Sequence, residues 1–230
     1  MKTLIESLEK TESYCQEIPY YPTSLKRPAP PPCSEEILPF LFLLPLAQKQ
    51  TVTERSIRLA AGFQLIHLSR AIHETIQPQT CPENRAIVLE GDLLSSLAYK
   101  IMIEEDPEQL ADAADIMAQS SEAWFLYRDF RKKRNYKDED YWKFLQKDYG
   151  LLCRRAAKAG AKEAQWTEEK TEIFCDMAEH LAYIYSIVKR NLPLNLGEEI
   201  ALVRKKAEEL QTVEEIESML SSLSAVDSSF

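Results

Sequence analysis

Glycine is scarce in this chain, and that scarcity limits the possible folds more than any other feature. Only 5 of the 230 residues are glycine, too few to supply the tight turns of many β-hairpins. Alanine, leucine, glutamate and lysine are abundant instead, and these are strong helix formers. The sequence therefore predicts an all-α chain. With 45% hydrophobic residues it can bury a sizeable core, and we expect one helical domain over residues 1–230.

The apolar positions repeat with a helical period along most of the chain. The segment 53–75 is apolar over a broad face, which is typical of a helix at the centre of a bundle. Two irregular regions are expected: a Pro-rich loop near 17–33 and a short C-terminal helical tail near 212–230. The expected helices between these regions cover 53–75, 84–103, 107–130, 140–161, 167–190 and 197–210.

The charge distribution argues against a nucleic-acid partner. The formal net charge is -9, whereas a nucleic-acid surface needs clustered positive charge. The only dense basic run, RDFRKKRNYK at 128–137, is followed at once by DED, and we interpret it as a solvated helix end and loop.

We expect no transmembrane segment and a cytoplasmic location. The most hydrophobic run, ILPFLFLLPLA at 37–47, is about half the length that a bilayer requires and contains two prolines. The first residues, MKTLIESLEKTES, lack the apolar region of a secretory signal. The five cysteines form no CxxC pair and suit a reducing compartment better than a zinc site or a disulfide framework.

No arrangement of residues in the sequence predicts a catalytic or metal site. Helical bundles that do chemistry usually project paired carboxylates or a Glu-x-x-His motif inward. Here His73 and Glu74 are adjacent, so their side chains point to different faces of a helix. Asp92 follows Gly91 inside an otherwise apolar helix and is the one carboxylate that looks buried. We interpret it as a hydrogen-bonding residue in a helix contact, and the alternative is a catalytic acid.

Five segments, in this order, resemble the trans-polyprenyl diphosphate synthases. The resemblance spans about 53–210 and implies an isoprenoid-synthase-like helical bundle, here reduced in size. Enzymes of that family elongate allylic diphosphates with isopentenyl diphosphate. The segments are LIHLSRAIHETI, AIVLEGDLLSSLAYKI, YGLLCRRAAKAGAKEA, MAEHLAYIYSIVKRN and EEIALVRKKAEEL.

The first aspartate-rich motif of that family is degenerate in this chain. In the family, the segment that ends in Ile-His runs into Asp-Asp-x-x-Asp, whose carboxylates hold Mg²⁺ on the substrate diphosphate. One carboxylate stands here where the family has three, and a lone carboxylate is a poor Mg²⁺ site. The residues at this place are Glu74, Thr75, Ile76, Gln77 and Pro78.

The second aspartate-rich motif is reversed in charge. The family's Phe-Gln-Ile-x corresponds to residues 185–188, and the next two positions, normally Asp-Asp, are Lys189 and Arg190. This exchange changes the local charge by about four units and would repel a divalent cation. The position of the lysine in the family's Lys-Thr-Ala motif is occupied here by Asp148. The family's Gly-Asp pair is kept as Gly91 and Asp92, to which we assign a structural role.

The chain thus keeps the segments of the family's fold but lacks its metal-binding motifs. In this it resembles the small subunits of heteromeric long-chain prenyl diphosphate synthases, such as component I of heptaprenyl diphosphate synthase. The resemblance implies a non-catalytic chain that binds no metal itself. It also implies a catalytic, aspartate-rich large subunit as partner, which would bind Mg²⁺, and a hepta- or hexaprenyl product for menaquinone side chains. By this analogy the helices over 53–75 and 84–103 would face the partner, with apolar faces covered only in the complex. The segment 37–47, Phe63 and Tyr99 are candidates to line a chain-length channel.

Two other classes of function remain open from the sequence. One is a helical enzyme with an unorthodox phosphate site that uses Lys189, Arg190 and Lys170. The other is a helical adaptor or regulatory module unrelated to prenyl synthesis, in which the ordered matches arise by chance.

Overall fold

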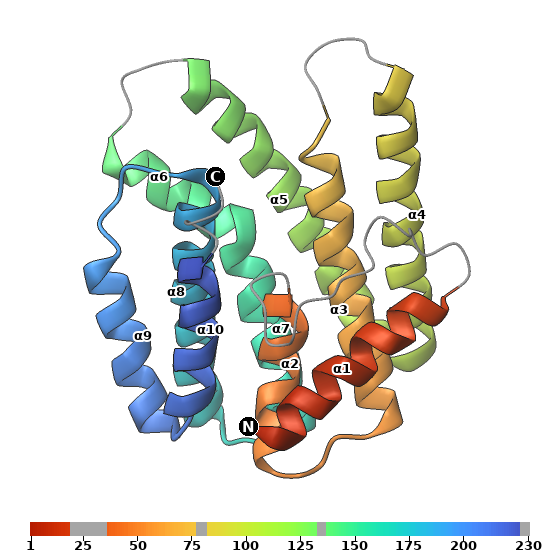
Figure 1. Ribbon diagram of the computed structural model, residues 1–230, viewed down its shortest axis with the longest axis vertical. Helices are drawn as coiled ribbons and strands as arrows, with labels where there is room; N and C mark the ends of the chain where they lie inside the picture. Colours follow the sequence, from red (N-terminus) through yellow and green to blue (C-terminus); the bar gives the residue numbers. More distant parts are fainter. Residues whose placement is uncertain (19–35, 77–81, 133–136, 226–230) are drawn as a thin grey trace.

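The computed structural model describes residues 1–18, 36–76, 82–132 and 137–225, and the regular structure in these ranges is helical. Most of the Pro-rich loop expected near 17–33 lies outside them, as does Pro78. Figure 1 shows the helices arranged as a bundle. Their bounds are α1 Lys2–Glu17, α2 Ile37–Gln48, α3 Glu54–His73, α4 Pro82–Glu105, α5 Pro107–Lys132, α6 Asp138–Leu145, a π-helical turn η3 Gln146–Gly150, α7 Leu151–Glu163, α8 Glu168–Arg190, α9 Gly197–Leu210 and α10 Val213–Ala225.

Helix α2 is the apolar run of the sequence, and it is buried along its length from Ile37 to Leu46. It packs against α7 so closely that a Cβ atom on Gly160 would lie 2.0 Å from the main-chain oxygen of Phe42. Only glycine permits this approach of two helix backbones. No helix in the described ranges is long and apolar enough to cross a bilayer.

Helix α3 passes through the centre of the bundle, as its broad apolar face predicted (Figure 1). It begins with a capping box in which the side chains of Thr53 and Ser56 each bond the other residue's backbone N–H. The helices α1, α2 and α4 cover it within this one chain. The expectation that the apolar face of 53–75 is covered only in a complex is therefore wrong.

Helix α4 lies on the outside of the bundle (Figure 1). Several of its apolar side chains are exposed to solvent. Leu89 is 63% exposed and Ile103 is 53% exposed. Of the channel candidates outside α2, Phe63 is buried against Phe42, with ring centroids 5.4 Å apart, while Tyr99 is half-buried on α4. The space beside Phe63 is thus filled by the chain's own core.

The segment 140–161, expected as one helix, is interrupted by η3. A π-helical turn adds one residue to a helical turn, and here it brings Asp148, Tyr149 and Gly150 to the interior together. Apolar periodicity does not reveal such an insertion, because the pattern resumes immediately in α7.

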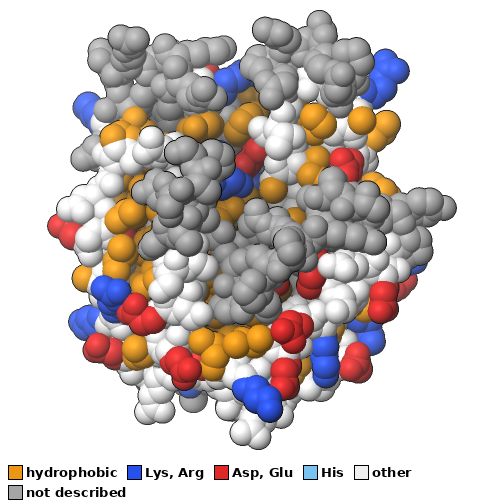
Figure 2. All heavy atoms as spheres, in the orientation of Figure 1, with side chains coloured by type: hydrophobic (Ala, Val, Ile, Leu, Met, Phe, Trp, Pro, Cys, Tyr) orange, Lys and Arg blue, Asp and Glu red, His pale blue; other side chains and the backbone are white. Residues whose placement is uncertain are grey.

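The surface seen in Figure 2 carries acidic and basic side chains interspersed over its lower half.

Candidate functional site: a buried ion cluster

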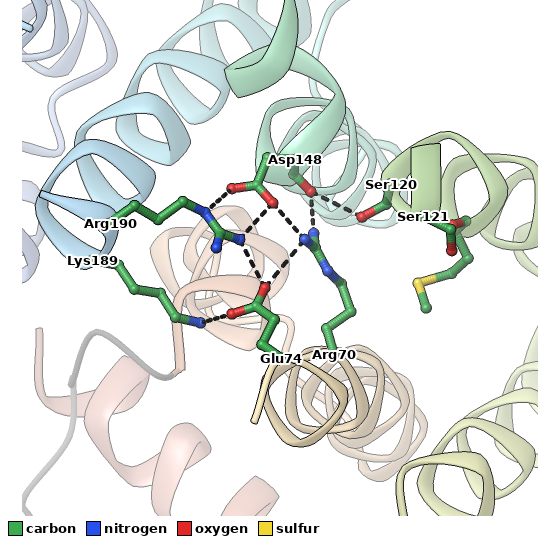
Figure 3. Close-up of polar contacts among 8 residues, drawn as sticks. Arg70, Glu74, Ser120, Ser121, Asp148, Lys189 and Arg190 are labelled. Carbon is green, nitrogen blue, oxygen red and sulfur yellow. Dashed lines mark hydrogen bonds and ion pairs between the residues drawn. The ribbon is translucent and has the colours of Figure 1, made fainter. Parts of the chain in front are cut away.

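The C-terminal ends of α3 and α8 meet the π-helical turn η3 at one point. Arg70 comes from the last turn of α3, and Glu74 is the residue that caps that helix. Lys189 and Arg190 form the end of α8, where Asn191 takes the left-handed conformation and stops the helix. Asp148 comes from η3. Figure 3 shows the two carboxylates between the three cationic side chains.

Arg190 joins both carboxylates. Its Nε donates to Oδ2 of Asp148 at 2.9 Å, and one terminal nitrogen donates to Oδ1 of the same carboxylate at 2.8 Å. That nitrogen also donates to Oε1 of Glu74 at 2.8 Å. The fork of the guanidinium group therefore matches the carboxylate of Asp148 in a bidentate pair, the strongest common form of this contact.

Arg70 holds Asp148 from the other side. One terminal nitrogen donates to Oδ1 of Asp148 at 2.5 Å, and the other donates to the main-chain oxygen of Asp148. The hydroxyl of Ser120 on α5 donates to that same oxygen at 3.1 Å. The guanidinium carbon of Arg70 lies 4.0 Å from the centre of the Tyr149 ring. Arg70 thus fixes both the side chain and the backbone of η3.

Glu74 contacts all three cations. Its carboxylate lies 2.9 Å from Nζ of Lys189, 2.8 Å from Arg190 and 3.5 Å from Arg70. A carboxylate at the C-terminal end of a helix is disfavoured by the helix dipole. The cations at the ends of α3 and α8 offset that repulsion and hold Glu74 in place.

The centre of the cluster is buried, whereas the side chain of Lys189 at its edge is 28% exposed. Burial strengthens the charge interactions at the centre. The side chain of Asp148 is 1% exposed and that of Arg190 is 5% exposed. Burial by itself would raise the pKa of Asp148, but Arg190 and Arg70 outweigh it and lower that pKa to about 2. Burial likewise opposes ionisation of Glu74, yet Arg190 and Lys189 lower its pKa. Both groups are carboxylates at neutral pH.

These residues do not fit a magnesium ion. Mg²⁺ requires free oxygen ligands, usually one or two carboxylates plus substrate phosphates. Here both carboxylates are bonded to cations, and the cluster has three cations to two carboxylates, a formal surplus of one positive charge. Within the described residues, no group of three or more His, Cys, Asp or Glu side chains could hold a metal ion.

The structure places the other predicted residues in different surroundings. The hydroxyl of Thr75 donates to the main-chain oxygen of Ile72 at 2.7 Å and serves the local turn. Gly91 is buried, and a Cβ there would lie 2.2 Å from Nε2 of His73, so its lack of a side chain lets α4 approach α3. His73 and Glu74 point to different elements, α4 and α8, as their adjacency predicted.

Asp92 is not the buried carboxylate that the sequence suggested. Its side chain is 63% exposed, and its contact with Nε2 of His73 is 3.4 Å long. Successive helical residues are rotated by about 100°, so the residue after the inward-facing Gly91 faces outward on this peripheral helix. The buried carboxylate is Asp148.

Lys170 does not belong with Lys189 and Arg190. It lies in the first turn of α8, whereas the pair forms the last turn, and 19 residues of helix span roughly 28 Å. Its Nζ lies 3.8 Å from the centre of the Trp166 ring instead. The three-residue phosphate site considered from the sequence is therefore wrong.

Sequence reasoning did not single out Arg70. It stands on the buried face of α3, where a cation must be paired to be tolerated, and it lies four residues before Glu74. That spacing is the signal that could have identified it.

The arrangement of helices matches solved structures. A decaprenyl diphosphate synthase from Rhodobacter capsulatus superposes with a TM-score of 0.68 at 17% identity, over 83% of this chain and 64% of that one. The chain has the prenyl diphosphate synthase fold. A geranyl diphosphate synthase small subunit from Antirrhinum majus gives a TM-score of 0.67 at 15% identity, over 94% of this chain and 97% of that one.

A geranyltranstransferase from Methanosarcina mazei gives a TM-score of 0.64 at 18% identity, over 92% of this chain and 90% of that one. The chain spans only 64% of the length of the decaprenyl synthase. No protein-family model and no curated protein matches the sequence. The predicted fold class, an isoprenoid-synthase-like helical bundle, is confirmed.

Proposed function

We propose that this chain is a non-catalytic small subunit that binds a catalytic, aspartate-rich subunit to form a heteromeric long-chain prenyl diphosphate synthase. The observation that carries the proposal is the direct bonding of Lys189 and Arg190 to Glu74 and of Arg190 to Asp148. By the sequence resemblance, these are positions where the enzymes hold metal ions and diphosphate. Acidic and basic side chains have exchanged places there, and they bond each other.

The charge exchange works against both ligands of the enzymatic reaction. Arg70, Lys189 and Arg190 would repel Mg²⁺, and a diphosphate would have to displace Glu74 and Asp148 from these cations. Admitting either ligand requires separating buried ion pairs, and removing one partner from such a pair costs about 3–5 kcal/mol. The cluster instead ties the ends of α3, η3 and α8 together without a ligand.

Catalysis and Mg²⁺ then belong to the partner subunit. A product of hepta- or hexaprenyl length, used for menaquinone side chains, follows from the resemblance to component I subunits. The filled space around Phe42 and Phe63 supports a channel that lies in the partner or at the interface. The outer face of α4, with Leu89 and Ile103 exposed, is the surface that the partner would cover.

The two alternatives are less well supported. An independent phosphate-binding enzyme would need cations free to bind phosphate, but Lys189 and Arg190 are held by carboxylates. A helical adaptor unrelated to prenyl synthesis is less favoured, because the chain shares its fold over 94% of its length with a geranyl diphosphate synthase small subunit.

Co-expression tests the proposal. The chain is expressed with an aspartate-rich prenyl synthase from the same genome, and the complex is isolated through a tag on the chain alone. We expect the two proteins to co-purify and the complex to make long-chain product. A large subunit that neither binds the chain nor needs it for full-length product would refute the proposal.

A further inference from the structure

A groove of about 210 Å³ opens beside the ion cluster, between the C-terminal end of α3 and the middle of α5. Ile76 forms an apolar wall on the α3 side, and Met117, Trp124 and Phe125 form the wall on α5. Phe125 is 56% exposed and stands at the rim. The groove is therefore open to solvent and mostly apolar along its sides.

Two charged side chains and two serines that line this groove already have protein partners. Arg70 and Glu74 bind each other and the rest of the ion cluster. Ser120 donates to the main-chain oxygen of Asp148, and Ser121 donates to that of Met117 at 2.9 Å. A charged ligand would have to compete with these existing ion pairs, whereas an uncharged apolar group would disturb none of these bonds.

The volume also limits what fits. Pockets for drug-sized ligands measure about 300–1,000 Å³, and a long prenyl chain needs more than this groove offers. A cavity of about 150 Å³ accepts a benzene molecule. The groove, at about 210 Å³, therefore suits one aromatic or large aliphatic side chain.

The groove adjoins α4 through His73. His73, which lines the groove, lies with its Nε2 atom 3.3 Å from the main-chain oxygen of Val88 on α4. Val88 and Leu89 are both exposed. A protein covering this face of α4 would therefore also reach the groove.

We propose that the groove is an anchor pocket for an aromatic or large aliphatic side chain of the catalytic subunit. This inference rests on the proposed function, because it assigns a docking point to the partner named there. Interfaces are dominated by a few such side chains seated in preformed pockets and surrounded by nearly neutral contacts. In this chain, the space beside the degenerate motif residue Glu74 would bind the partner instead of substrate.

The test fills the groove without changing the core. Ser121→Phe places an aromatic ring in the groove from an exposed position on α5. Gln119→Phe adds the same ring to an exposed position on the same helix that does not line the groove. Affinity for the catalytic subunit is measured by titration. We expect Ser121→Phe to weaken binding at least about tenfold and Gln119→Phe to leave it within about twofold.

A second variant, Phe125→Ala, removes one wall and should also weaken binding. If the wild-type chain binds the catalytic subunit and both groove variants bind it equally well, the anchor pocket is refuted and the proposed function stands. If the wild-type chain binds no catalytic subunit, the proposed function itself fails.

Other occupants of the groove give distinct results. Binding of farnesyl diphosphate to the isolated chain, lost in Ser121→Phe, would identify a lipid site and overturn the proposal. Self-association of the wild-type chain that Ser121→Phe abolishes would identify a second copy as occupant and would also overturn it.

Discussion

Arg190 forms a bidentate ion pair with Asp148, at 2.9 and 2.8 Å, across 42 residues of sequence. The two residues stand where the sequence resemblance places an aspartate and a lysine, so the sign of each position is reversed. The pair joins the end of α8 to η3 directly, and Arg70 extends the connection to α3. This local bonding is the basis of the predictions that follow.

Asp148→Asn should destabilise the fold by about 3–5 kcal/mol, because it leaves buried Arg70 and Arg190 with Glu74 as their remaining carboxylate. Urea unfolding followed by circular dichroism measures the loss. Asp92→Asn is the matched control at an exposed site, and its effect should stay within about 0.5 kcal/mol. Equal stability of the two variants would show that the cluster contributes nothing.

The cluster should make the chain sensitive to acid. The pKa of Asp148 in the folded chain is about 2, below the value of about 3.9 for an unfolded aspartate. The stabilisation is therefore complete above about pH 5 and is lost as the pH falls through 2, with a size of about 2.6 kcal/mol. Unfolding free energies measured over this window should fall more steeply for the wild-type chain than for Asp148→Asn. If the unfolding free energies of the two proteins fall equally with pH, Asp148 is not the source of the acid sensitivity.

Restoring aspartates at the second motif should not restore an enzyme. In Lys189→Asp with Arg190→Asp, two new carboxylates would face Glu74 and Asp148, and each close like-charge pair costs about 4 kcal/mol at 4 Å under an effective dielectric constant of 20. We expect lower stability than in the charge-free control, Lys189→Met with Arg190→Met. We also expect no Mg²⁺-dependent turnover of isopentenyl diphosphate. Turnover by the aspartate variant would show that the two cations alone prevent catalysis in this chain.

The approach of α2 to α7 should tolerate no side chain at residue 160. Gly160→Ala would force its Cβ against the main-chain oxygen of Phe42, and we expect a loss of about 1–3 kcal/mol from overpacking. Gly197→Ala is the control, because its Cβ would meet only the side-chain oxygen of Asn195 at 3.2 Å. Thermal unfolding of both variants measures the difference. Equal melting temperatures would rule out the close contact between α2 and α7.

The sequence predicted the parts of this structure that depend on regular patterns. A broad apolar period identified α3 as a central helix, and the order of the motifs located Glu74, Lys189 and Arg190. The pattern did not show that Lys189 and Arg190 bond Glu74 directly, because a motif position says nothing about which distant residue lies opposite.

Three discrepancies between the sequence-based predictions and the structure have a physical cause in tertiary packing. Asp92 was misjudged because apolar neighbours suggested burial, whereas α4 lies at the edge of the bundle and turns that position outward. The inward position of Asp148 depends on η3, and one extra residue in a turn leaves no trace in the composition. Arg70 was overlooked because a single cation among apolar residues is ordinarily exposed.

The most direct test of the account is an assay of labelled isopentenyl diphosphate incorporation, with an allylic diphosphate and Mg²⁺ present. The purified chain, its candidate catalytic subunit and an equimolar mixture are compared. The account predicts long-chain product in the mixture and no turnover by the chain alone, since its motif residues bond each other. Mg²⁺-dependent product formation by the purified chain alone would contradict it.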